Sequence, residues 1–223
     1  MISIAFQQEL IEKIPEIRLG CLACEVLIKP SNESIKLLAE DIIAQIQSEF
    51  SIEAISQKPT IKSTKDGYRK LGKDPSRYRP SAEALTRRIV NGKDLYWINN
   101  IVDLLNLISL ESGYSIGGYD ADKISGVIEF GIGKESEPYL AIGRGELNIE
   151  NLPVFRDEAG AFGSPTSDSL RTMVTDATKH FLMVIIDFGR HSILENTLNR
   201  SMELYKKFGN VTSIETKVIS PIG

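Results

Sequence analysis

Cysteine, histidine and tryptophan are scarce in this chain of 223 residues, which contains two Cys, two His and one Trp. So few cysteines exclude a disulfide-rich scaffold, and a zinc site with four Cys or His ligands would need every one of these side chains. No apolar run approaches the ~20 residues that a membrane-spanning helix needs. Residues 1–6 contain no basic side chain, so we expect no signal peptide, no membrane association and a cytoplasmic location.

The two cysteines, Cys21 and Cys24, stand in a C-x-x-C spacing. The residues that follow them, 25–28, are typical of a strand. Side chains three positions apart in a strand point to opposite faces of the sheet, so we expect the two thiols to be separated. The chain also has no Walker loop and no G-x-S-x-G motif. The sequence therefore predicts neither a metal site nor a cofactor.

Hydrophobic spacing predicts an α+β fold, because helices and strands are mixed without strict alternation. Helices are expected at 33–49, at about 82–91, at 99–112 and at 192–208, and strands at 17–28, 124–130, 139–142, 181–188 and 211–218. The strand at 181–188 is apolar almost throughout and should be central in its sheet. Residues 56–80 have weak periodicity and are expected to be irregular. No stretch has the composition of a linker, so residues 1–223 are expected to form a single domain.

The net charge of −4 is unevenly distributed along the chain. Residues 58–93 contain eleven Lys and Arg residues but three acidic ones, and Tyr68 and Tyr78 lie among them. Guanidinium groups bind phosphates and aromatic rings stack on bases, so this pattern favours a contact with RNA. The predicted RNA-binding residues are Arg69, Lys70, Arg77, Arg79, Arg87 and Arg88. In the alternative interpretation, which the sequence leaves open, nearby acidic side chains neutralise the segment.

Three polar segments are candidates for the lining of a ligand pocket. The first is a stripe of two amides and a carboxylate on one face of the helix at 99–112. The second is a pair of glycines and a tyrosine directly after that helix, where a ligand can approach the backbone closely. The third is the hydroxyl-rich segment 163–169 with the arginine that follows it. The predicted pocket residues are Asn99, Asp103, Asn106, Gly117, Gly118, Tyr119, Asp168, Ser169 and Arg171. A helix cap, a plain turn and a polar loop are the structural alternatives.

The same segments carry the motifs of a known family. Residues 98–106 read I-N-N-I-V-D-L-L-N, residues 117–124 read G-G-Y-D-A-D-K-I, and residues 68–88 contain Y-R-K-x-G, Y-R-P-S-x-E-A-L and R-R. In this order, over about residues 60–190, they resemble the B3/4 domain of the phenylalanyl-tRNA synthetase beta subunit and its free-standing bacterial relatives. The resemblance implies a layered β/β/α domain in which sheets and helices surround a pocket.

In the synthetase, this pocket binds the 3′ end of a mischarged tRNA and hydrolyses its ester. The resemblance therefore implies binding of tRNA or aminoacyl-tRNA and, for an active enzyme, hydrolysis of mischarged tRNA in trans. Leu105 and Gly117 depart from the family, which has Thr and usually His at these positions, so tyrosine-specific editing is not implied. Alternatively, the pocket takes an amino-acid-like small molecule without RNA, or the domain is an interaction module without a ligand.

Overall fold

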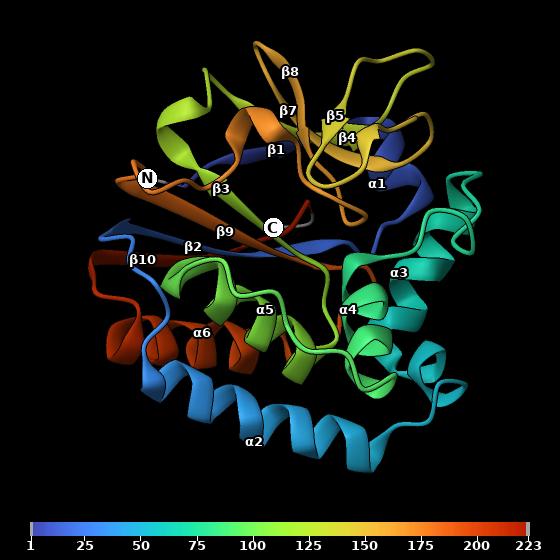
Figure 1. Cartoon of the computed structure of the whole chain (residues 1–223). Helices are drawn as coiled ribbons and strands as arrows, with labels where there is room; N and C mark the ends of the chain where they lie inside the picture. The colour runs from blue at the N-terminus through green and yellow to red at the C-terminus, as the bar shows by residue number, and fades with distance from the viewer. Residues whose placement is uncertain (1, 222–223) are drawn as a thin grey trace.

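Two four-stranded sheets lie face to face, and helices cover the outer face of one of them (Figure 1). This computed structural model describes residues 2–221. The strand order in the helix-covered sheet is β10-β2-β9-β3, and all neighbouring strands are antiparallel. The order in the second sheet is β1-β4-β7-β8, in which β1 is parallel to β4. The predicted α+β class and its layered β/β/α arrangement are thus confirmed.

The helices and strands have well-defined bounds. The helices are α1 (Gln8–Lys13), α2 (Glu33–Glu49), α3 (Pro59–Lys70), α4 (Ser81–Val90), α5 (Asn100–Ser112) and α6 (Leu194–Phe208). The strands are β1 (Ile4–Phe6), β2 (Arg18–Val26), β3 (Ile116–Asp120), β4 (Ile128–Ile132), β5 (Leu140–Ala141), β6 (Gly145–Glu146), β7 (Pro153–Asp157), β8 (Gly160–Gly163), β9 (His180–Asp187) and β10 (Val211–Ile219). Strands β5 and β6 form a small hairpin of their own.

Strand β9 is central and contributes to two hydrophobic cores, as its apolar composition predicted. The side chains in the core between the sheets are Leu182, Val184 and Ile186, and those in the core against the helices are Phe181, Met183 and Ile185. The neighbouring strand β2 divides its two cysteines in the same way, with Cys21 in the first core and Cys24 in the second. Burial raises the pKa of both thiols to about 12. The expected separation of the thiols is therefore confirmed.

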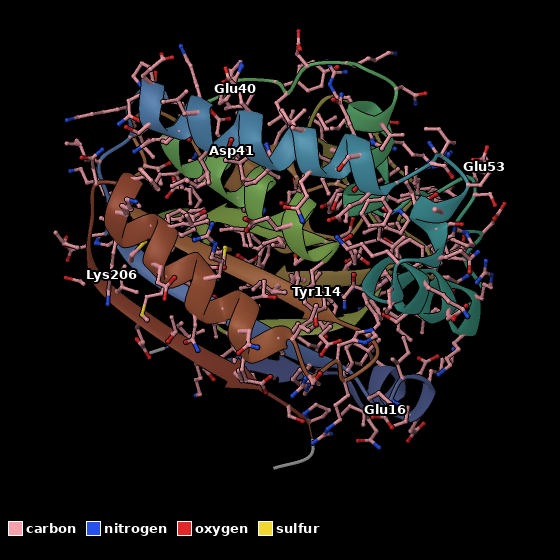
Figure 2. All side chains as sticks on the ribbon, turned by 90° about the horizontal axis from the view of Figure 1, so that it is seen from below. Glu16, Glu40, Asp41, Glu53, Tyr114 and Lys206 are labelled. Atoms are coloured by element: carbon pink, nitrogen blue, oxygen red, sulfur yellow. The ribbon has the colours of Figure 1, made fainter. Side chains whose placement is uncertain are left out.

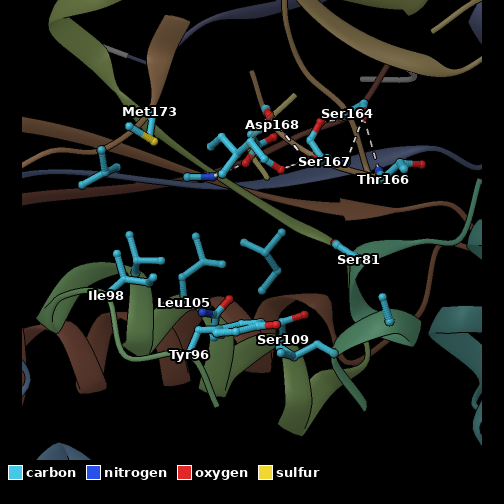
Figure 3. Close-up of a pocket in the computed structure, with 18 of the residues that line it drawn as sticks. Ser81, Tyr96, Ile98, Leu105, Ser109, Ser164, Thr166, Ser167, Asp168 and Met173 are labelled. Atoms are coloured by element: carbon cyan, nitrogen blue, oxygen red, sulfur yellow. Dashed lines mark hydrogen bonds between the residues drawn. The ribbon is translucent and has the colours of Figure 1, made fainter. Parts of the chain in front are cut away.

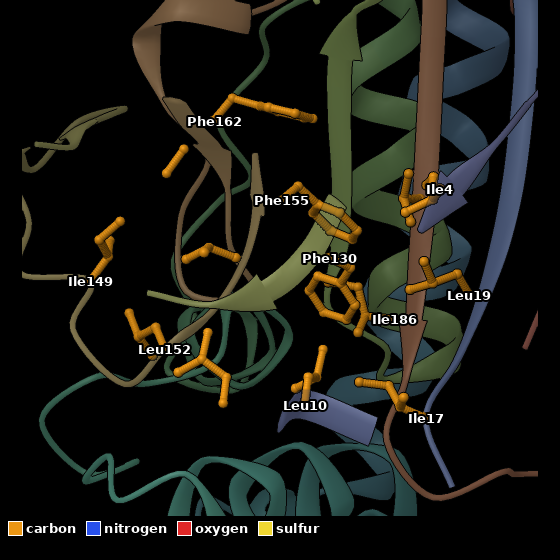
Figure 4. Close-up of a cluster of buried hydrophobic side chains, with 14 of the residues drawn as sticks. Ile4, Leu10, Ile17, Leu19, Phe130, Ile149, Leu152, Phe155, Phe162 and Ile186 are labelled. Atoms are coloured by element: carbon orange, nitrogen blue, oxygen red, sulfur yellow. The ribbon is translucent and has the colours of Figure 1, made fainter. Parts of the chain in front are cut away.

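Aromatic rings fill much of the space between the two sheets (Figure 4). The rings of Phe130 and Phe155 are stacked with their centroids 4.2 Å apart. The ring of Tyr119, on β3, meets that of Phe162, on β8, edge to face at 5.0 Å. Such pairs add roughly 0.5–1.5 kcal/mol to the free energy gained from burying the rings. They fix β3 against β8, and the segment that follows β8 thereby acquires a defined position.

The helix layer is built on α5, which has a defined start and end. The side chain of Asn99 caps its first turn by accepting hydrogen bonds from the backbone N–H groups of Ile101 and Val102. Gly113 ends the helix in the left-handed conformation, with a φ of 76°. Helices α2 and α6 turn charged side chains outward, among them Glu40, Asp41 and Lys206 (Figure 2). Within residues 2–221, no helix is long and apolar enough to cross a membrane.

The segment 56–80, expected to be irregular, contains helix α3, so that prediction was wrong. Pro59 occupies the first turn, where its missing N–H group is not needed. Thr64 is buried and donates its hydroxyl to the carbonyl of Thr60 one turn earlier. Gly67 faces the ring of Phe188, and an added Cβ would lie 2.5 Å from that ring. A hydrogen bond within the helix and the contact with Phe188 accommodate the polar composition of α3, and a local hydrophobic pattern reveals neither of them.

Candidate functional site

A cavity of about 540 Å³ lies between the helix layer and the loop that follows β8 (Figure 3). One wall is mostly apolar and comes from α4, α5 and β3, through residues Ala84, Leu85, Val102, Leu105 and Ile116. The opposite wall contains the polar residues Ser164, Thr166, Ser167 and Asp168, together with Met173. Small-molecule sites have volumes of about 300–1,000 Å³ and combine such apolar surface with a few polar groups. The cavity is therefore large enough for an amino-acid-sized ligand.

Gly118 brings strand β3 and helix α5 together at the base of the cavity. An added Cβ at Gly118 would lie 2.6 Å from a methyl group of Leu105 and 3.2 Å from the ring of Phe181. The absence of a side chain therefore lets the helix pack directly on the strand. Strand β3 lies at the edge of its sheet, and the backbone N–H of Gly118 donates a hydrogen bond to Asp168 Oδ2, at 3.2 Å.

The polar wall is held in shape by its own hydrogen bonds. Ser164 Oγ accepts from the backbone N–H groups of Thr166 and Ser167 at 3.3 and 3.2 Å, and donates to the carbonyl of Ser167 at 2.9 Å. The hydroxyl groups of Thr166 and Tyr68 lie 2.8 Å apart. Tyr139 donates its hydroxyl to the carbonyl of Ser167 at 2.7 Å. These bonds fix the loop before any ligand binds.

Asp168 is the one carboxyl group in the cavity lining contributed by residues 2–221. Its Oδ1 accepts from the hydroxyl of Tyr119 at 3.0 Å, and its Oδ2 accepts from Gly118. Burial raises the pKa of Asp168 to about 7, although both hydrogen bonds favour the charged form. A carboxyl group with this pKa can accept or release a proton near neutral pH.

Two arginines lie at the opening of the cavity. Arg88, on α4, donates to the hydroxyl of Tyr96 at 2.9 Å, and its guanidinium carbon lies 3.7 Å from the centre of that ring. Arg144 lies in the turn of the β5–β6 hairpin, between two glycines with positive φ. Its side chain is exposed and makes no hydrogen bond or ion pair with the residues that the structure describes. Both cations also lie on the lining of the cavity.

All three predicted segments reach this cavity, but through a minority of the predicted residues. Those in the lining are Asn106, Gly118 and Asp168. Gly117 and Tyr119 face the opposite side of β3, where an added Cβ at Gly117 would lie 2.0 Å from the hydroxyl of Tyr119. Tyr119 therefore reaches the site through its bond to Asp168 and does not border the cavity itself.

Asn99 and Asp103, two further predicted pocket residues, are buried structural groups outside the lining. Asn99 is the helix cap described above. Asp103 accepts from the N–H of Ile98 at 2.9 Å and from the hydroxyl of Ser31 at 2.5 Å. Burial raises the pKa of Asp103, and these hydrogen bonds oppose the shift. Asn99 and Asp103 thus form hydrogen bonds within the protein and do not face the cavity.

Ser169 and Arg171 lie on a second, more open hollow of about 1,030 Å³. Arg171 donates two hydrogen bonds to the carboxylate of Asp157, at 2.8 and 3.1 Å, and a third to the carbonyl of Gly160. Its guanidinium group is therefore engaged in joining η3 (Leu170–Thr172) to the end of β7. The hydroxyl of Ser169 accepts from the N–H of Arg171 at 3.2 Å. These two residues line the second hollow and do not line the first cavity.

The basic segment is partly neutralised within the protein. Glu83 is buried on α4 and forms ion pairs with Lys65 at 3.3 Å, with Arg79 at 3.8 Å and with Arg87 at 2.9 Å. Arg69 pairs with Asp66. Of the predicted RNA contacts, Lys70 and Arg77 are exposed and form no ion pair with any residue from 2 to 221. Internal ion pairs thus neutralise a part of the basic segment, as the alternative interpretation expected, and the contact with RNA stays a prediction.

Of the residues at the cavity opening, Arg88 was among the predicted RNA contacts, but Tyr96, Ile98 and Arg144 were not found by the sequence patterns. Tyr96 and Ile98 border the cavity, and the exposed Trp97 lies between them in the chain. The run of three large apolar residues directly before the helix cap could have indicated a contact surface, because such residues are normally buried. Arg144 could be suspected from the glycines on either side of it, which are typical of a hairpin tip.

Comparisons with known proteins identify relatives of this chain. The family described as B3/4 domain matches residues 64–205. The phenylalanine–tRNA ligase beta subunit of Mycoplasma pneumoniae is 28% identical over 117 residues, which cover 52% of this chain and 14% of that protein. An N-terminal fragment of the phenylalanyl-tRNA synthetase beta subunit from Pyrococcus horikoshii aligns with 97% of this chain and 50% of its own, at 13% identity and a TM-score of 0.47. Because the family match spans more than half of its residues, the chain belongs to the B3/4 domain family.

Proposed function

We propose that the cavity receives the aminoacylated 3′ end of a tRNA and that the protein hydrolyses the ester bond between the amino acid and the ribose. The observation that carries the proposal is the presence of Asp168 in the lining of a cavity of amino-acid size, together with apolar side chains and two arginines. The chain spans 14% of the length of its synthetase relative, so this activity is proposed for the domain alone. The tRNA substrate is suggested by the name of that relative.

The two walls suit the two ends of such a substrate. An amino-acid side chain would pack on the apolar wall, next to Leu105 and Val102. The ester and the ribose hydroxyls would face the polar wall, where hydroxyl and amide groups can form hydrogen bonds with them. Arg88 and Arg144 at the opening would face the phosphates of the last nucleotides. This orientation places the ester nearest to Asp168.

Asp168 supplies the proton transfers that hydrolysis requires. Water attacks the carbonyl carbon of the ester, and its proton passes to the Asp168 carboxylate. The bond between the carbonyl carbon and the ribose oxygen then breaks, and the proton returns to that oxygen. The products are a free amino acid and a tRNA with a free terminal hydroxyl group. Tyr119 and the backbone N–H of Gly118 hold the carboxylate in place from behind.

A deacylation assay over a panel of mischarged tRNAs tests the proposal. We expect the protein to accelerate the loss of the amino acid from at least one member of the panel. The proposal is wrong if every tRNA loses its amino acid equally fast with and without the protein. Because the cavity wall opposite Asp168 is apolar, tRNAs carrying aliphatic amino acids belong at the head of the panel.

Arg144 provides a separate test of the tRNA contact. We expect Arg144→Gln to weaken tRNA binding and to reduce the slope of log K against log salt concentration by about one, as the loss of one phosphate contact would. Filter binding over a salt series measures both quantities. Lys206→Gln removes the same charge from α6, outside the cavity, and should leave the slope unchanged. Equal slopes for wild type and Arg144→Gln would remove Arg144 from the contact.

A second candidate function is the binding of a free amino acid or a related small molecule in the same cavity. The pairing of Arg69, Arg79 and Arg87 with internal acids favours this alternative, because these charges are less available to phosphates. A ligand at one hundred times its dissociation constant stabilises a protein by about 2.7 kcal/mol. A rise in melting temperature with an amino acid, together with no tRNA binding at low salt, would establish this function instead.

A further inference from the structure

Three consecutive large apolar residues are exposed at the edge of the cavity. Tyr96, Trp97 and Ile98 expose 63%, 44% and 58% of their surface, although each is of a type that normally lies in a core or an interface. A run of exposed apolar residues is unfavourable for a soluble domain unless it has a function. Tyr96 and Ile98 also line the cavity, so the exposed run is continuous with the candidate site.

This segment is held rigidly. Leu95 before it is buried, and the backbone N–H of Ile98 donates to the buried carboxylate of Asp103 at 2.9 Å. Arg88 Nε donates to the carbonyl of Asp94 at 2.5 Å. The Arg88 guanidinium group lies over the ring of Tyr96 and is bonded to its hydroxyl, as described above. Arg88 and Tyr96 therefore form a cationic and aromatic surface before any partner binds, and the exposed Trp97 is the next residue in the chain. We call Arg88, Tyr96 and Trp97 the stacking platform.

We infer that the stacking platform binds the unpaired nucleobases at the 3′ end of an RNA whose terminal residue occupies the cavity. The inference rests on the proposed function and adds a binding surface to it. Every nucleobase has a flat face that stacks on aromatic rings and guanidinium planes, and positive charge attracts the phosphates between the bases. Arg88 and Tyr96 both line the cavity, so a strand whose last residue enters it can contact them.

The position of the single tryptophan makes this inference directly measurable. Trp97 is the one Trp in the chain, so the intrinsic tryptophan emission comes from this position alone. The probe is a short single-stranded oligoribonucleotide that ends in the CCA sequence of tRNA, added to the whole protein. We expect its bases to quench the Trp97 emission in a saturable manner. Intact uncharged tRNA should produce the same change, because its 3′ end is also unpaired.

Variants separate stacking from charge and from folding. We expect Trp97→Ala and Tyr96→Ala each to weaken tRNA binding by about tenfold or more, as the loss of a stacked base predicts. Arg88→Lys keeps the charge but removes the planar group, and should weaken binding as well. Leu37→Ala removes an equally exposed apolar side chain from α2 and should bind as the wild type does. Thermal unfolding shows whether each variant is folded.

The outcomes distinguish the platform from the proposed function. If tRNA binds but the Trp97 emission is unchanged, and Trp97→Ala and Tyr96→Ala bind as tightly as the wild type, the platform is excluded and the proposed function stands. If neither the oligoribonucleotide nor tRNA binds at low salt, both are excluded. Quenching that persists in Tyr96→Ala and Arg88→Lys with unchanged affinity also contradicts stacking on the platform.

Discussion

Replacing Asp168 with Asn is expected to slow hydrolysis of the aminoacyl ester by roughly 10²–10⁴-fold, the range over which positioned acid–base groups contribute to catalysis. The substitution removes the proton acceptor but preserves the size and shape of the side chain. Binding of uncharged tRNA should therefore remain unchanged. Asp176→Asn, at an exposed carboxylate outside the cavity lining, is the matched control and should hydrolyse at the wild-type rate.

The pH dependence of this rate identifies the role of Asp168 more sharply. The charged carboxylate accepts the proton, so the rate should rise with pH through the raised pKa of about 7 and then level off. Tyr119→Phe removes a hydrogen bond that favours the charged form, which raises the pKa further. The rising part of the profile should then move to higher pH. The other ionisable groups around Asp168 are Tyr119 itself, Tyr139, and Arg88 and Arg144 at the opening.

Two results would contradict this role. The first is a rate for Asp168→Asn within a few-fold of the wild type. The second is a pH profile that is the same for Tyr119→Phe and the wild type. The pKa of a carboxylate with only a structural role does not determine the pH dependence of the rate, so removing its hydrogen bond would not change the profile. Unfolding curves of both variants should accompany the rates, so that a loss of folding is recognised. Single-turnover measurements with saturating protein separate the chemical step from binding.

Removing Asp187 should destabilise the fold by about 3 kcal/mol, the cost of breaking a buried ion pair by removing one of its members. Asp187 is fully buried at the end of β9, where its Oδ2 accepts from Arg18 Nη2 at 3.0 Å. Its Oδ1 accepts from the N–H of Gly189 at 3.1 Å, which fixes the chain after the strand. Asp187→Ala therefore loses a charge pair and a turn-forming hydrogen bond together.

Glu195 provides the internal control for this substitution. It pairs with the same arginine at 2.9 Å, but its side chain is 51% exposed. Exposed ion pairs contribute about 0–1 kcal/mol, so Glu195→Ala should cost far less than Asp187→Ala. Urea denaturation of the two variants gives both free energies of unfolding. Equal costs would mean that the burial of Asp187 does not decide its contribution.

The long regular elements were predictable from the sequence because their patterns are local. The apolar run of β9 indicated a strand buried on both faces, and α5 was delimited by its cap at Asn99 and its end at Gly113. Helix α3 was not predictable in this way. Its buried face contains Thr60, Thr64 and Gly67, which fit there because of the carbonyls and the Phe188 ring that they meet. Two of these partners, the carbonyl of Ser112 and the ring of Phe188, lie elsewhere in the chain.

The candidate site was predictable at the level of segments and less so at the level of side chains. The structure has the predicted helical spacing of Asn99, Asp103 and Asn106. The carboxylate of Asp103, however, accepts hydrogen bonds from Ile98 and Ser31, which lie outside the helix. The partner of Arg171 is Asp157, on a different strand. In both cases a partner outside the predicted segment decides whether the polar side chain lines a cavity or forms a hydrogen bond within the protein. A sequence pattern contains the spacing but not that partner.

The division of the two cysteines between separate cores gives the protein a pair of internal reporters of local opening. Each thiol reacts with an alkylating agent only when its own surroundings open, because the buried thiol is neutral. With Cys24→Ser, alkylation of Cys21 would follow separation of the two sheets; with Cys21→Ser, alkylation of Cys24 would follow detachment of the helices. Different labelling rates in the two variants would show that one interface loosens while the other stays closed.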